Sequence, residues 1–264
     1  MGIIMNASPN NLGKCRIIKL LNFLNCQHFS RGDSPMKAVI IAAGKGIRLL
    51  PLTEEKPKTM VEINGRPFLY YIIKHLQQAG FHQLSIVVGY KKEKMVEFLQ
   101  QQAIPATIIE QQEQLGTGHA LLQARKFCGN SNFLMLGGDN LFSGRDMKAL
   151  PMNDALSYVT GAVVEEWRKY GILVTKDSSL IKIVEKSETF VGNLANAGLY
   201  KFTPEIWPAL EKIQKSPRGE YEVTDAINML AKKRKVKVLQ LNDYWLDLGE
   251  KEDVVNIEGF LKDY

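Results

Sequence analysis

Residues 37–58 read KAVIIAAGKGIRLLPLTEEKPK, and this stretch decides the fold. Its first part, Lys37 to Ala42, is a short apolar run of the kind that forms a buried strand. A loop with Gly44 and Gly46 follows at once, and Phe68 to Ala79 then has the apolar spacing of an amphipathic helix. A strand, a loop and a helix in this order predict the start of a βαβ unit.

The same order recurs along the first half of the chain. Further strands are predicted at Leu84 to Val88, Ala106 to Ile109 and Phe133 to Leu136, and further helices at Lys92 to Gln102 and Gly118 to Lys126. This alternation predicts an α/β fold with a Rossmann-like, mostly parallel sheet flanked by helices. Ligands of such open sheets bind beyond the carboxyl ends of the strands, so chemistry is expected in the loops that follow them.

After Asp154 the pattern changes to an antiparallel extension of short strands. The strand segments are SYVTGAVV from residue 157, GILVTKD from 171, LIKIVEK from 180 and AGLYKF from 197, with a turn at Asp177 to Ser179. Helices are predicted at Pro204 to Ile213, Val223 to Lys233 and Glu252 to Leu261, with a strand at Val236 to Leu241. We therefore expect one domain over residues 36–264.

The first 35 residues differ in texture from this domain and form an N-terminal extension of uncertain status. Lys14, Arg16, Lys19 and Arg31 against Asp33 place +3 of the formal net charge of +6 there. Ile17 to Leu24 is too short to span a membrane and lacks a cleavage site. Two interpretations stay open: a short amphipathic helix that packs on the domain, or an upstream extension before a working start at Met36, which is slightly favoured.

Composition excludes several classes of function. The remainder of the chain is only mildly basic, which suits small anionic substrates and gives no support for a nucleic-acid surface. No stretch is long and apolar enough to predict a membrane segment. Three widely spaced cysteines, without a CxxC motif, argue against structural zinc and disulfides and predict a reducing, cytoplasmic compartment.

The loop after the first strand is suited to a polyphosphate. Its glycines let backbone N–H groups approach phosphate oxygens, and Arg48 and Lys58 can neutralise their charge. Neither the P-loop spacing nor the dinucleotide GxGxxG motif is present, because Leu49 stands where the third glycine would be. A glycine-rich turn with a surface arginine is also common in other proteins, so this loop alone is weak support for a nucleotide site.

Three further segments carry unusual residues. QQEQLGTGHA, from residue 111, joins a strand to a helix whose glycine-rich start can accept an anion. Gly137-Gly138-Asp139-Asn140 places a carboxylate directly after an apolar strand, where it could hold Mg²⁺. The second half contributes YG at 170, EK at 185, NAG at 196 and WLDLG at 245. Read alone, Glu185 and Lys186 are a solvated pair and Trp245 is a core residue.

Together these segments resemble a known family. AAGKGIRLLPLTEEKPKTMVEINGRPFLYY, from residue 42, resembles the opening signature of the sugar-1-phosphate nucleotidyltransferases, which include glucose-1-phosphate thymidylyltransferases and the uridylyltransferase domain of the enzyme that makes UDP-N-acetylglucosamine. The resemblance runs from Met36 to Tyr264 and implies the nucleotide-diphospho-sugar transferase fold. Ile47 departs from the pattern, because the family usually has Thr or Ser there, so one hydroxyl is missing from the phosphate cradle.

The resemblance also implies a role for each segment. The implied nucleotide-binding residues are Ala43, Gly44, Gly46, Gln111, Gly116 and Thr117, and Gln111 and Gly116 have the spacing that relatives use to bind uracil or thymine. The implied sugar-phosphate residues are Gly171, Glu185, Lys186 and Asn196, the implied Mg²⁺ ligands are Asp139 and Asp247, and the implied catalytic cations are Arg48, Lys58 and Lys186. His119 is given no chemical role, and Thr224 and Asp225 are interpreted as helix-capping residues.

The implied substrates are a nucleoside triphosphate, UTP or dTTP, and a sugar 1-phosphate, whose reaction releases pyrophosphate. Two alternatives stay open. A catalytically silent regulatory paralogue is one, although all the implied charged residues are present; a choline-phosphate cytidylyltransferase is the other, although it should not carry the Gln-Leu-Gly-Thr-Gly loop. No left-handed β-helix acyltransferase domain follows in the sequence, so we expect a monofunctional enzyme. The sequence does not decide the sugar, the choice between UTP and dTTP, or whether the protein is a homo-oligomer.

Overall fold

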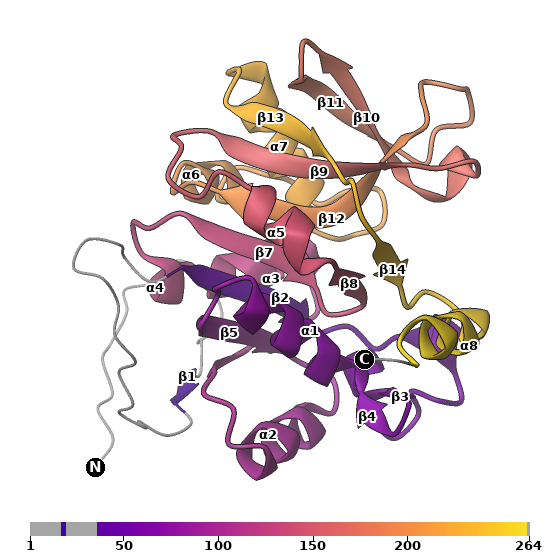
Figure 1. Cartoon of the computed structure of the whole chain (residues 1–264). Helices are drawn as coiled ribbons and strands as arrows, with labels where there is room; N and C mark the ends of the chain where they lie inside the picture. The colour runs from indigo at the N-terminus through magenta and orange to yellow at the C-terminus, as the bar shows by residue number, and fades with distance from the viewer. Residues whose placement is uncertain (1–16, 20–35, 263–264) are drawn as a thin grey trace.

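The computed structural model describes residues 17–19 and 36–262 of the 264-residue chain. A ten-stranded sheet forms its centre, in the order β1-β6-β5-β2-β7-β12-β10-β11-β13-β9 (Figure 1). The strands of this sheet are β1 (Ile17–Lys19), β2 (Lys37–Ala42), β5 (Gln83–Val88), β6 (Thr107–Glu110), β7 (Phe133–Gly137), β9 (Ser157–Val163), β10 (Gly171–Lys176), β11 (Ser179–Glu185), β12 (Leu194–Phe202) and β13 (Val236–Gln240).

Two small two-stranded sheets and a set of helices complete the fold. The small sheets pair β3 (Glu62–Ile63) with β4 (Arg66–Pro67), and β8 (Asn140–Phe142) with β14 (Trp245–Asp247). The α-helices are α1 (Phe68–Gln78), α2 (Lys92–Gln101), α3 (Thr117–Gln123), α4 (Arg125–Cys128), α5 (Gly144–Ala149), α6 (Ile206–Leu210), α7 (Val223–Lys232) and α8 (Lys251–Phe260), and the 3₁₀ turns are η1 (Ile47–Leu49), η2 (Lys58–Met60) and η3 (Trp167–Lys169).

Strand direction divides the sheet in two. The pairs β6–β5, β5–β2 and β2–β7 are parallel, as the alternating pattern predicted. β12 then joins β7 in antiparallel fashion and also pairs antiparallel with β9 and β10. The second half is mixed rather than wholly antiparallel, because β13 runs parallel to β9 after helix α7 has returned the chain along the sheet.

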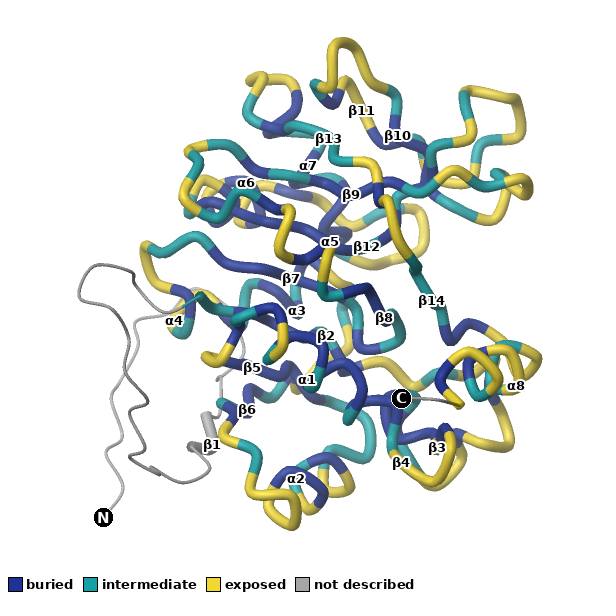
Figure 2. The backbone as a smooth tube through the Cα atoms, viewed as in Figure 1, coloured by how far each residue is buried: buried dark blue, intermediate teal, exposed yellow. Residues whose placement is uncertain are grey.

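Alternation along the strands gives the sheet two apolar faces. Ala38 and Ile40 of β2 pack into the cluster that includes helix α1, whereas Val39 packs into the cluster that includes α3, α6 and α7. Successive side chains of a strand point to opposite faces, so a continuous apolar run fills both clusters. The central strands are accordingly buried along nearly their whole length (Figure 2). The sheet is a rigid base for the loops at its carboxyl edge.

Several predicted element bounds are wrong, and short elements were missed. The helix predicted from Gly118 to Lys126 is two helices, because Ala124 donates its N–H to the carbonyl of Leu121 and tightens the last turn of α3. α6 is shorter than predicted, and β12 begins at Leu194 instead of Ala197. The elements α5, β8 and β14 were not predicted, since segments this short have no readable period.

The structure describes three residues of the N-terminal extension, and these test part of the prediction for it. Ile17–Lys19 is a strand, antiparallel to β6, so the alternative of an amphipathic helix from Ile17 to Leu24 is wrong at its start: the backbone pairs with a sheet edge instead of with itself. The rest of that prediction, and Cys15 and Cys26, lie outside the described residues. Cys128 is buried as a free thiol. Within residues 17–19 and 36–262, no helix has the length and apolar character that crossing a membrane requires.

Candidate active site

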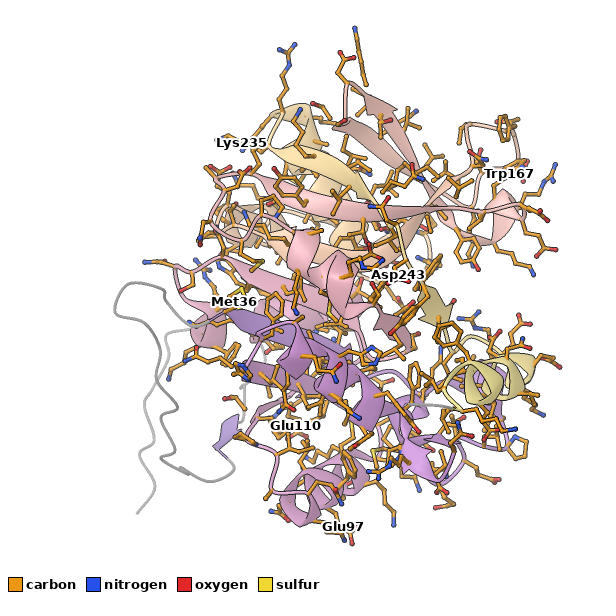
Figure 3. All side chains as sticks on the ribbon, viewed as in Figure 1. Met36, Glu97, Glu110, Trp167, Lys235 and Asp243 are labelled. Carbon is orange, nitrogen blue, oxygen red and sulfur yellow. The ribbon has the colours of Figure 1, made fainter. Side chains whose placement is uncertain are left out.

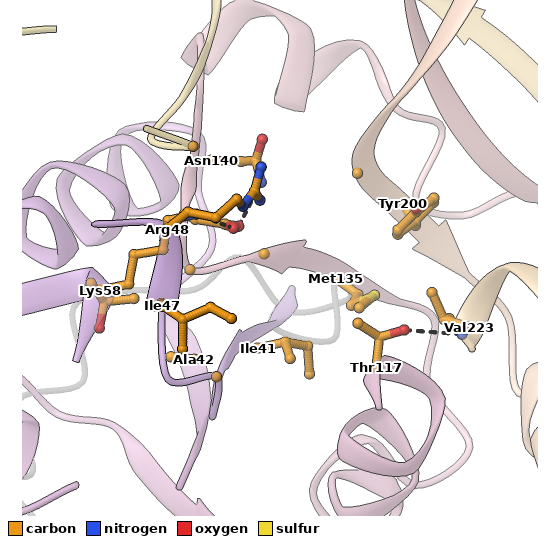
Figure 4. Close-up of a pocket in the computed structure, with 18 residues that line it drawn as sticks. Ile41, Ala42, Ile47, Arg48, Lys58, Thr117, Met135, Asn140, Tyr200 and Val223 are labelled. Atoms are coloured by element: carbon orange, nitrogen blue, oxygen red, sulfur yellow. Dashed lines mark hydrogen bonds and ion pairs between the residues drawn. The ribbon is translucent and has the colours of Figure 1, made fainter. Parts of the chain in front are cut away.

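A cleft of about 430 Å³ opens at the carboxyl ends of β2 and β7, next to β12, which pairs antiparallel with β7 (Figure 4). Six of the predicted site residues line it: Gly44, Gly46, Arg48, Lys58, Thr117 and Asp139. Arg48, Lys58 and Asn140 lie on one side of the cleft, and Thr117, Tyr200 and Val223 on the other. Loops that are far apart in sequence therefore meet at the edge where ligands of open sheets bind.

The glycine-rich loop wraps around the start of this cleft. Gly46 has φ +65°, and a Cβ there would lie 2.9 Å from Cβ of Lys58, so the loop depends on glycine for both its conformation and its approach to η2. Thr53 donates its hydroxyl hydrogen to the Gly46 carbonyl at 2.8 Å. Ile47 lines the cleft with 70% of its surface exposed. Ala43 does not line the cleft; its carbonyl accepts the N–H of Tyr90.

Asp139 is held by two donors from different parts of the chain. Nζ of Lys58 donates to one carboxylate oxygen at 2.8 Å, and Nδ2 of Asn140 donates to the other at 2.7 Å. Oδ1 of Asn140 accepts the indole N–H of Trp245 at 2.6 Å. Because an indole N–H can only donate, it fixes the amide so that the NH₂ group faces Asp139. Sequence reasoning missed Asn140 and Trp245 as a linked pair.

Asp247 reaches the same place through the pairing of β14 with β8. In this antiparallel register Asp247 stands opposite Asn140, and Leu248 donates its N–H to the Asp139 carbonyl at 2.8 Å. Burial, followed by the negative charge of Asp139, raises the pKa of Asp247 to about 6. Asp247 is not among the residues that line the cleft, although Gly249 is. The two predicted carboxylates are thus neighbours that repel each other in the absence of a cation.

A buried carboxylate fixes the segment that leads into β14. Asp146 is 1% exposed and accepts the N–H groups of Asn242 and Asp243 at 3.0 and 3.1 Å. Asp146 lies in the first turn of α5, and Ser143 caps that helix by accepting the backbone N–H of Asp146. Asp243 lies at the junction that these bonds hold (Figure 3). A signal was available here, because Ser143 followed three residues later by Asp146 is a helix-start pattern.

The predicted base-binding residues lie beside the cleft, and none but Thr117 lines it. Gly116 has φ +99°, and a Cβ there would lie 2.7 Å from the Tyr221 carbonyl. Gly118 donates its N–H to the same carbonyl at 2.7 Å, and the Thr117 hydroxyl accepts the N–H of Val223 at 3.1 Å. The turn before α3 is therefore fastened to residues 221–223, a contact that sequence reasoning missed.

Gln111 and His119 are in direct contact within this loop. Gln111 is 4% exposed, and its Nε2 lies 3.2 Å from the Gly116 carbonyl and 2.9 Å from Nδ1 of His119. Burial lowers the pKa of His119, against a smaller opposite effect of Glu113. His119, to which the sequence gave no chemical role, is thus a neighbour of the predicted base-binding side chain.

The predicted sugar-phosphate residues gather at the ends of β10, β11 and β12, and none of them lines the cleft. Gly171 stands opposite Glu185, and a Cβ at Gly171 would lie 2.9 Å from Oε1 of Glu185. The residue as a whole is exposed, but desolvation of its carboxyl group raises the pKa of Glu185, and a hydrogen bond from Thr224 partly offsets this rise. Helix α7 has Glu222 as its N-cap, so the interpretation of Thr224 and Asp225 as capping residues is wrong: both lie within the first turn.

Two further residues of this group take different positions. Asn196 donates Nδ2 to the hydroxyl of Tyr200 at 2.7 Å, and Tyr200 lines the cleft, so Asn196 reaches it through that ring. Lys186 is exposed and follows β11 with φ +40°. Its backbone N–H donates to the Tyr170 carbonyl at 3.3 Å. Lys186 therefore stands at the exposed, open end of β11.

Comparison with known proteins gives consistent likenesses. The chain is 38% identical over 231 residues to a UTP–glucose-1-phosphate uridylyltransferase of Haloferax volcanii, covering 83% of this chain and 93% of that protein. It is 36% identical over 230 residues to a bifunctional sugar-1-phosphate nucleotidylyltransferase/acetyltransferase of Sulfurisphaera tokodaii, covering 86% of this chain and only 56% of the relative.

The fold has a close counterpart among solved structures. A UDP-glucose pyrophosphorylase, solved in complex with UDP-glucose, superimposes with a TM-score of 0.78 at 25% identity over 88% of this chain and 100% of that one. The model of the nucleotidyl transferase family matches residues 37–263. The loops that meet at the cleft all lie within this range. The chain belongs to the nucleotidyl transferase family.

Proposed function

We propose that the protein transfers a nucleotidyl group from UTP or dTTP to a sugar 1-phosphate and releases pyrophosphate. The observation that carries this proposal is the meeting of two cations and two carboxylates from three segments: Arg48 and Lys58 of the loop after β2 and Asp139 after β7 line the cleft, and Asp247 of β14 lies beside it. The relatives named above act on such substrates, which supports the same reaction class here. A binding protein would not require two repelling carboxylates at one edge of its ligand site.

The proposed reaction is an in-line displacement at the α-phosphorus of the triphosphate. An oxygen of the sugar 1-phosphate forms the new P–O bond, and the bond between the α-phosphorus and the bridging oxygen to the β-phosphorus breaks. The electron pair leaves with pyrophosphate. A phosphate monoester is already ionised at neutral pH, so the protein needs neither a nucleophile nor a general base of its own. Its work is to align two anions and to neutralise their charge.

Each proposed role follows from a side chain's position. The backbone of Ala43, Gly44 and Gly46 would cradle the triphosphate, because the loop around Gly44 leaves open space where a Cβ would stand. Arg48 would neutralise the leaving β- and γ-phosphates. Lys58 would hold the α-phosphate next to Asp139, to which it is already bonded. Lys186, at the open end, would bind the incoming sugar phosphate.

The two carboxylates fit Mg²⁺ by their chemistry. Asp139 keeps a fixed orientation through Lys58 and Asn140, and the raised pKa of Asp247 reports a desolvated carboxylate beside another negative charge. A hard divalent cation prefers one or two such carboxylates together with phosphate oxygens and water. When bound by Asp139 and Asp247, Mg²⁺ would neutralise the charge of the substrate phosphates.

The remaining roles concern recognition of the two substrates. Gln111 and Gly116 would contact the pyrimidine, with Thr117 at the adjoining wall of the cleft. Gly171, Glu185 and Asn196 would bind the sugar, since they converge beside Tyr200, which lines the cleft. A cytoplasmic location also belongs to this proposal, because the substrates are intracellular metabolites.

One experiment tests the proposed function. Pyrophosphate release is measured with UTP, dTTP, CTP, ATP and GTP, each combined with glucose 1-phosphate, N-acetylglucosamine 1-phosphate, mannose 1-phosphate or choline phosphate. We expect release with UTP or dTTP and one of the sugar phosphates, and release slower by roughly 10²-fold or more from Asp139→Asn. Release with CTP and choline phosphate alone would favour the cytidylyltransferase alternative. Binding of UTP without release in any combination would favour the silent paralogue.

A further inference from the structure

Gln111 makes all of its side-chain hydrogen bonds through one end. Within residues 17–19 and 36–262, both contacts of its amide use Nε2, to the Gly116 carbonyl and to Nδ1 of His119. Oε1 receives no donor from these residues, and it is not one of their fully buried unpaired atoms. The amide therefore has a satisfied NH₂ end and an oxygen open to a ligand.

The orientation of this amide follows from its neighbours' chemistry. A backbone carbonyl can only accept, so the end that faces Gly116 has to be the NH₂ group. The same NH₂ group then faces Nδ1 of His119 at 2.9 Å, whereas the NH₂ group of Gln123, which also donates to the His119 carbonyl, faces Nε2 of the ring at 3.2 Å. A neutral ring accepts at only one nitrogen, and we assign that role to Nδ1 because its contact is the shorter one. Burial of His119 lowers its pKa and favours this neutral form, against a smaller opposing effect of Glu113.

An amide that offers only its oxygen distinguishes the pyrimidine bases. Uracil and thymine carry a hydrogen on N3 and can donate it to Oε1, whereas N3 of cytosine is an acceptor. Cytosine would require the opposite end of the amide, which is already bonded to Gly116 and His119. A mismatched base would leave two acceptors facing each other without a hydrogen.

We propose that His119 is a positioning residue that locks the Gln111 amide with its oxygen toward the base, and so makes the enzyme select uracil or thymine over cytosine. This inference rests on the proposed function, because it needs the base to bind at Gln111. His119 itself touches no substrate. Without its Nδ1, only the longer 3.2 Å contact to Gly116 would hold the amide, and rotation would present NH₂ to cytosine.

Two substitutions separate positioning from packing. His119→Asn keeps an acceptor, because its Oδ1 can occupy the place of Nδ1. His119→Leu fills the same space without an acceptor. His82→Leu, at an exposed histidine before β5, is the matched control for the loss of an imidazole. Binding of UTP and CTP is measured by calorimetry without an acceptor sugar, so the result does not depend on turnover, and melting curves check the fold.

We expect the ratio of UTP to CTP affinity to fall roughly two- to tenfold in His119→Leu, the range of one neutral hydrogen bond. The ratio should stay unchanged in His119→Asn and His82→Leu. Equal weakening of both triphosphates in His119→Leu would overturn the inference, since packing alone does not distinguish the bases. Failure of the wild-type protein to bind UTP would overturn the proposed function, and the inference with it.

A second measurement needs no substitution. The ¹⁵N chemical shifts of the His119 ring in the wild-type protein report which nitrogen carries the hydrogen. We expect an unprotonated Nδ1 and a protonated Nε2 at neutral pH. A hydrogen on Nδ1 would overturn the inference even if UTP is preferred, because that tautomer cannot accept from Gln111.

Discussion

The proposed nucleotide end and the proposed sugar end of the site are built in different ways. At the nucleotide end, Gly46, Arg48 and Asp139 follow parallel strands and line one cleft. At the sugar end, Gly171, Glu185 and Asn196 belong to antiparallel strands, and they lie beside that cleft without lining it. The residues of the first group come together because their strands run in the same direction. Those of the second come together because of the register in which their strands pair.

This difference has a simple geometric cause. Parallel strands all end at the same edge of a sheet, so the loops after β2 and β7 converge whatever their detailed pairing. Neighbouring antiparallel strands end at opposite edges, so Gly171 meets Glu185 only because the register of β10 and β11 puts them opposite each other. Substitutions at the nucleotide end should therefore disturb catalysis strongly, and substitutions at the sugar end should mainly disturb the binding of one substrate.

The largest effect is expected at Asp139. Asp139→Asn removes a carboxylate from the point where charge stabilisation is the main catalytic contribution, so turnover should fall by roughly 10²-fold or more while the protein stays folded. Initial rates at saturating Mg²⁺ and a melting curve measure the two properties, with Asp177→Asn in an exposed turn as control. Near-normal turnover would remove Asp139 from the proposed metal site.

A smaller effect is expected at Arg48. Arg48→Ala should weaken triphosphate binding and slow the chemical step, each by roughly tenfold, because one cation near the leaving phosphates is lost. Initial rates over a range of UTP concentrations separate the two changes, and Arg145→Ala at an exposed position of α5 is the control. A response to UTP identical to that of the wild type would contradict this assignment.

The burial of Asp247, together with its repulsion by Asp139, should be visible in stability. The folded protein raises the pKa of Asp247 to about 6, above its ordinary value, so the fold favours the protonated form. The associated stability is present at acid pH and is lost as the pH rises through 6. Without Mg²⁺, Asp247→Asn should thus increase the free energy of unfolding by roughly 1 kcal/mol at pH 7.5.

Urea unfolding at pH 7.5 and pH 4, in the absence of Mg²⁺, tests this expectation. The gain from Asp247→Asn should be largest at pH 7.5 and should shrink at pH 4, where the wild-type carboxyl is protonated as well. Equal stability of the two proteins at pH 7.5 would mean that the carboxylates do not strain the fold.

The smallest effect is expected at the sugar end. Gly171→Ala would place a Cβ 2.9 Å from Oε1 of Glu185, and the flexible carboxylate would move aside. We expect KM for the sugar 1-phosphate to rise roughly threefold, with KM for UTP unchanged, since a shift of this kind costs well under the energy of a full hydrogen bond. Gly259→Ala, at an exposed position of α8 where the added Cβ would meet nothing within 4 Å, is the control. Equal changes in KM for the sugar 1-phosphate and KM for UTP would contradict the proposed difference between the nucleotide end and the sugar end.

The order of the elements was the most predictable part of the fold. The apolar runs of β2 and β7 and the amphipathic period of α1 can be read locally, because side-chain spacing reports secondary structure. The parallel strands then placed Gly44, Arg48 and Asp139 at one edge before any pairing was known. For this reason the convergence of these loops could be expected from the sequence, whereas the meeting of Gly171 with Glu185 could not.

Contacts that depend on tertiary pairing could not be predicted. The three-residue strands β8 and β14 have no period of their own, and they form because distant segments pair. The contact between Gln111 and His119 depends on a turn fastened to Tyr221, so spacing alone gave His119 no role. By contrast, the start of α5 at Ser143 carried a local signal that went unused.

The pairing of β14 with β8 also has a consequence for biosynthesis. Asp139 and Asp247 are separated by more than a hundred residues, and the strands that join them are among the last contacts the growing chain can make. A ribosome adds roughly 5–20 residues per second, so the parallel half can emerge and fold for several seconds while its cleft still lacks the second carboxylate. If the proposed roles hold, a nascent chain in that interval has the loops that bind the nucleotide and lacks the second carboxylate that its consumption requires.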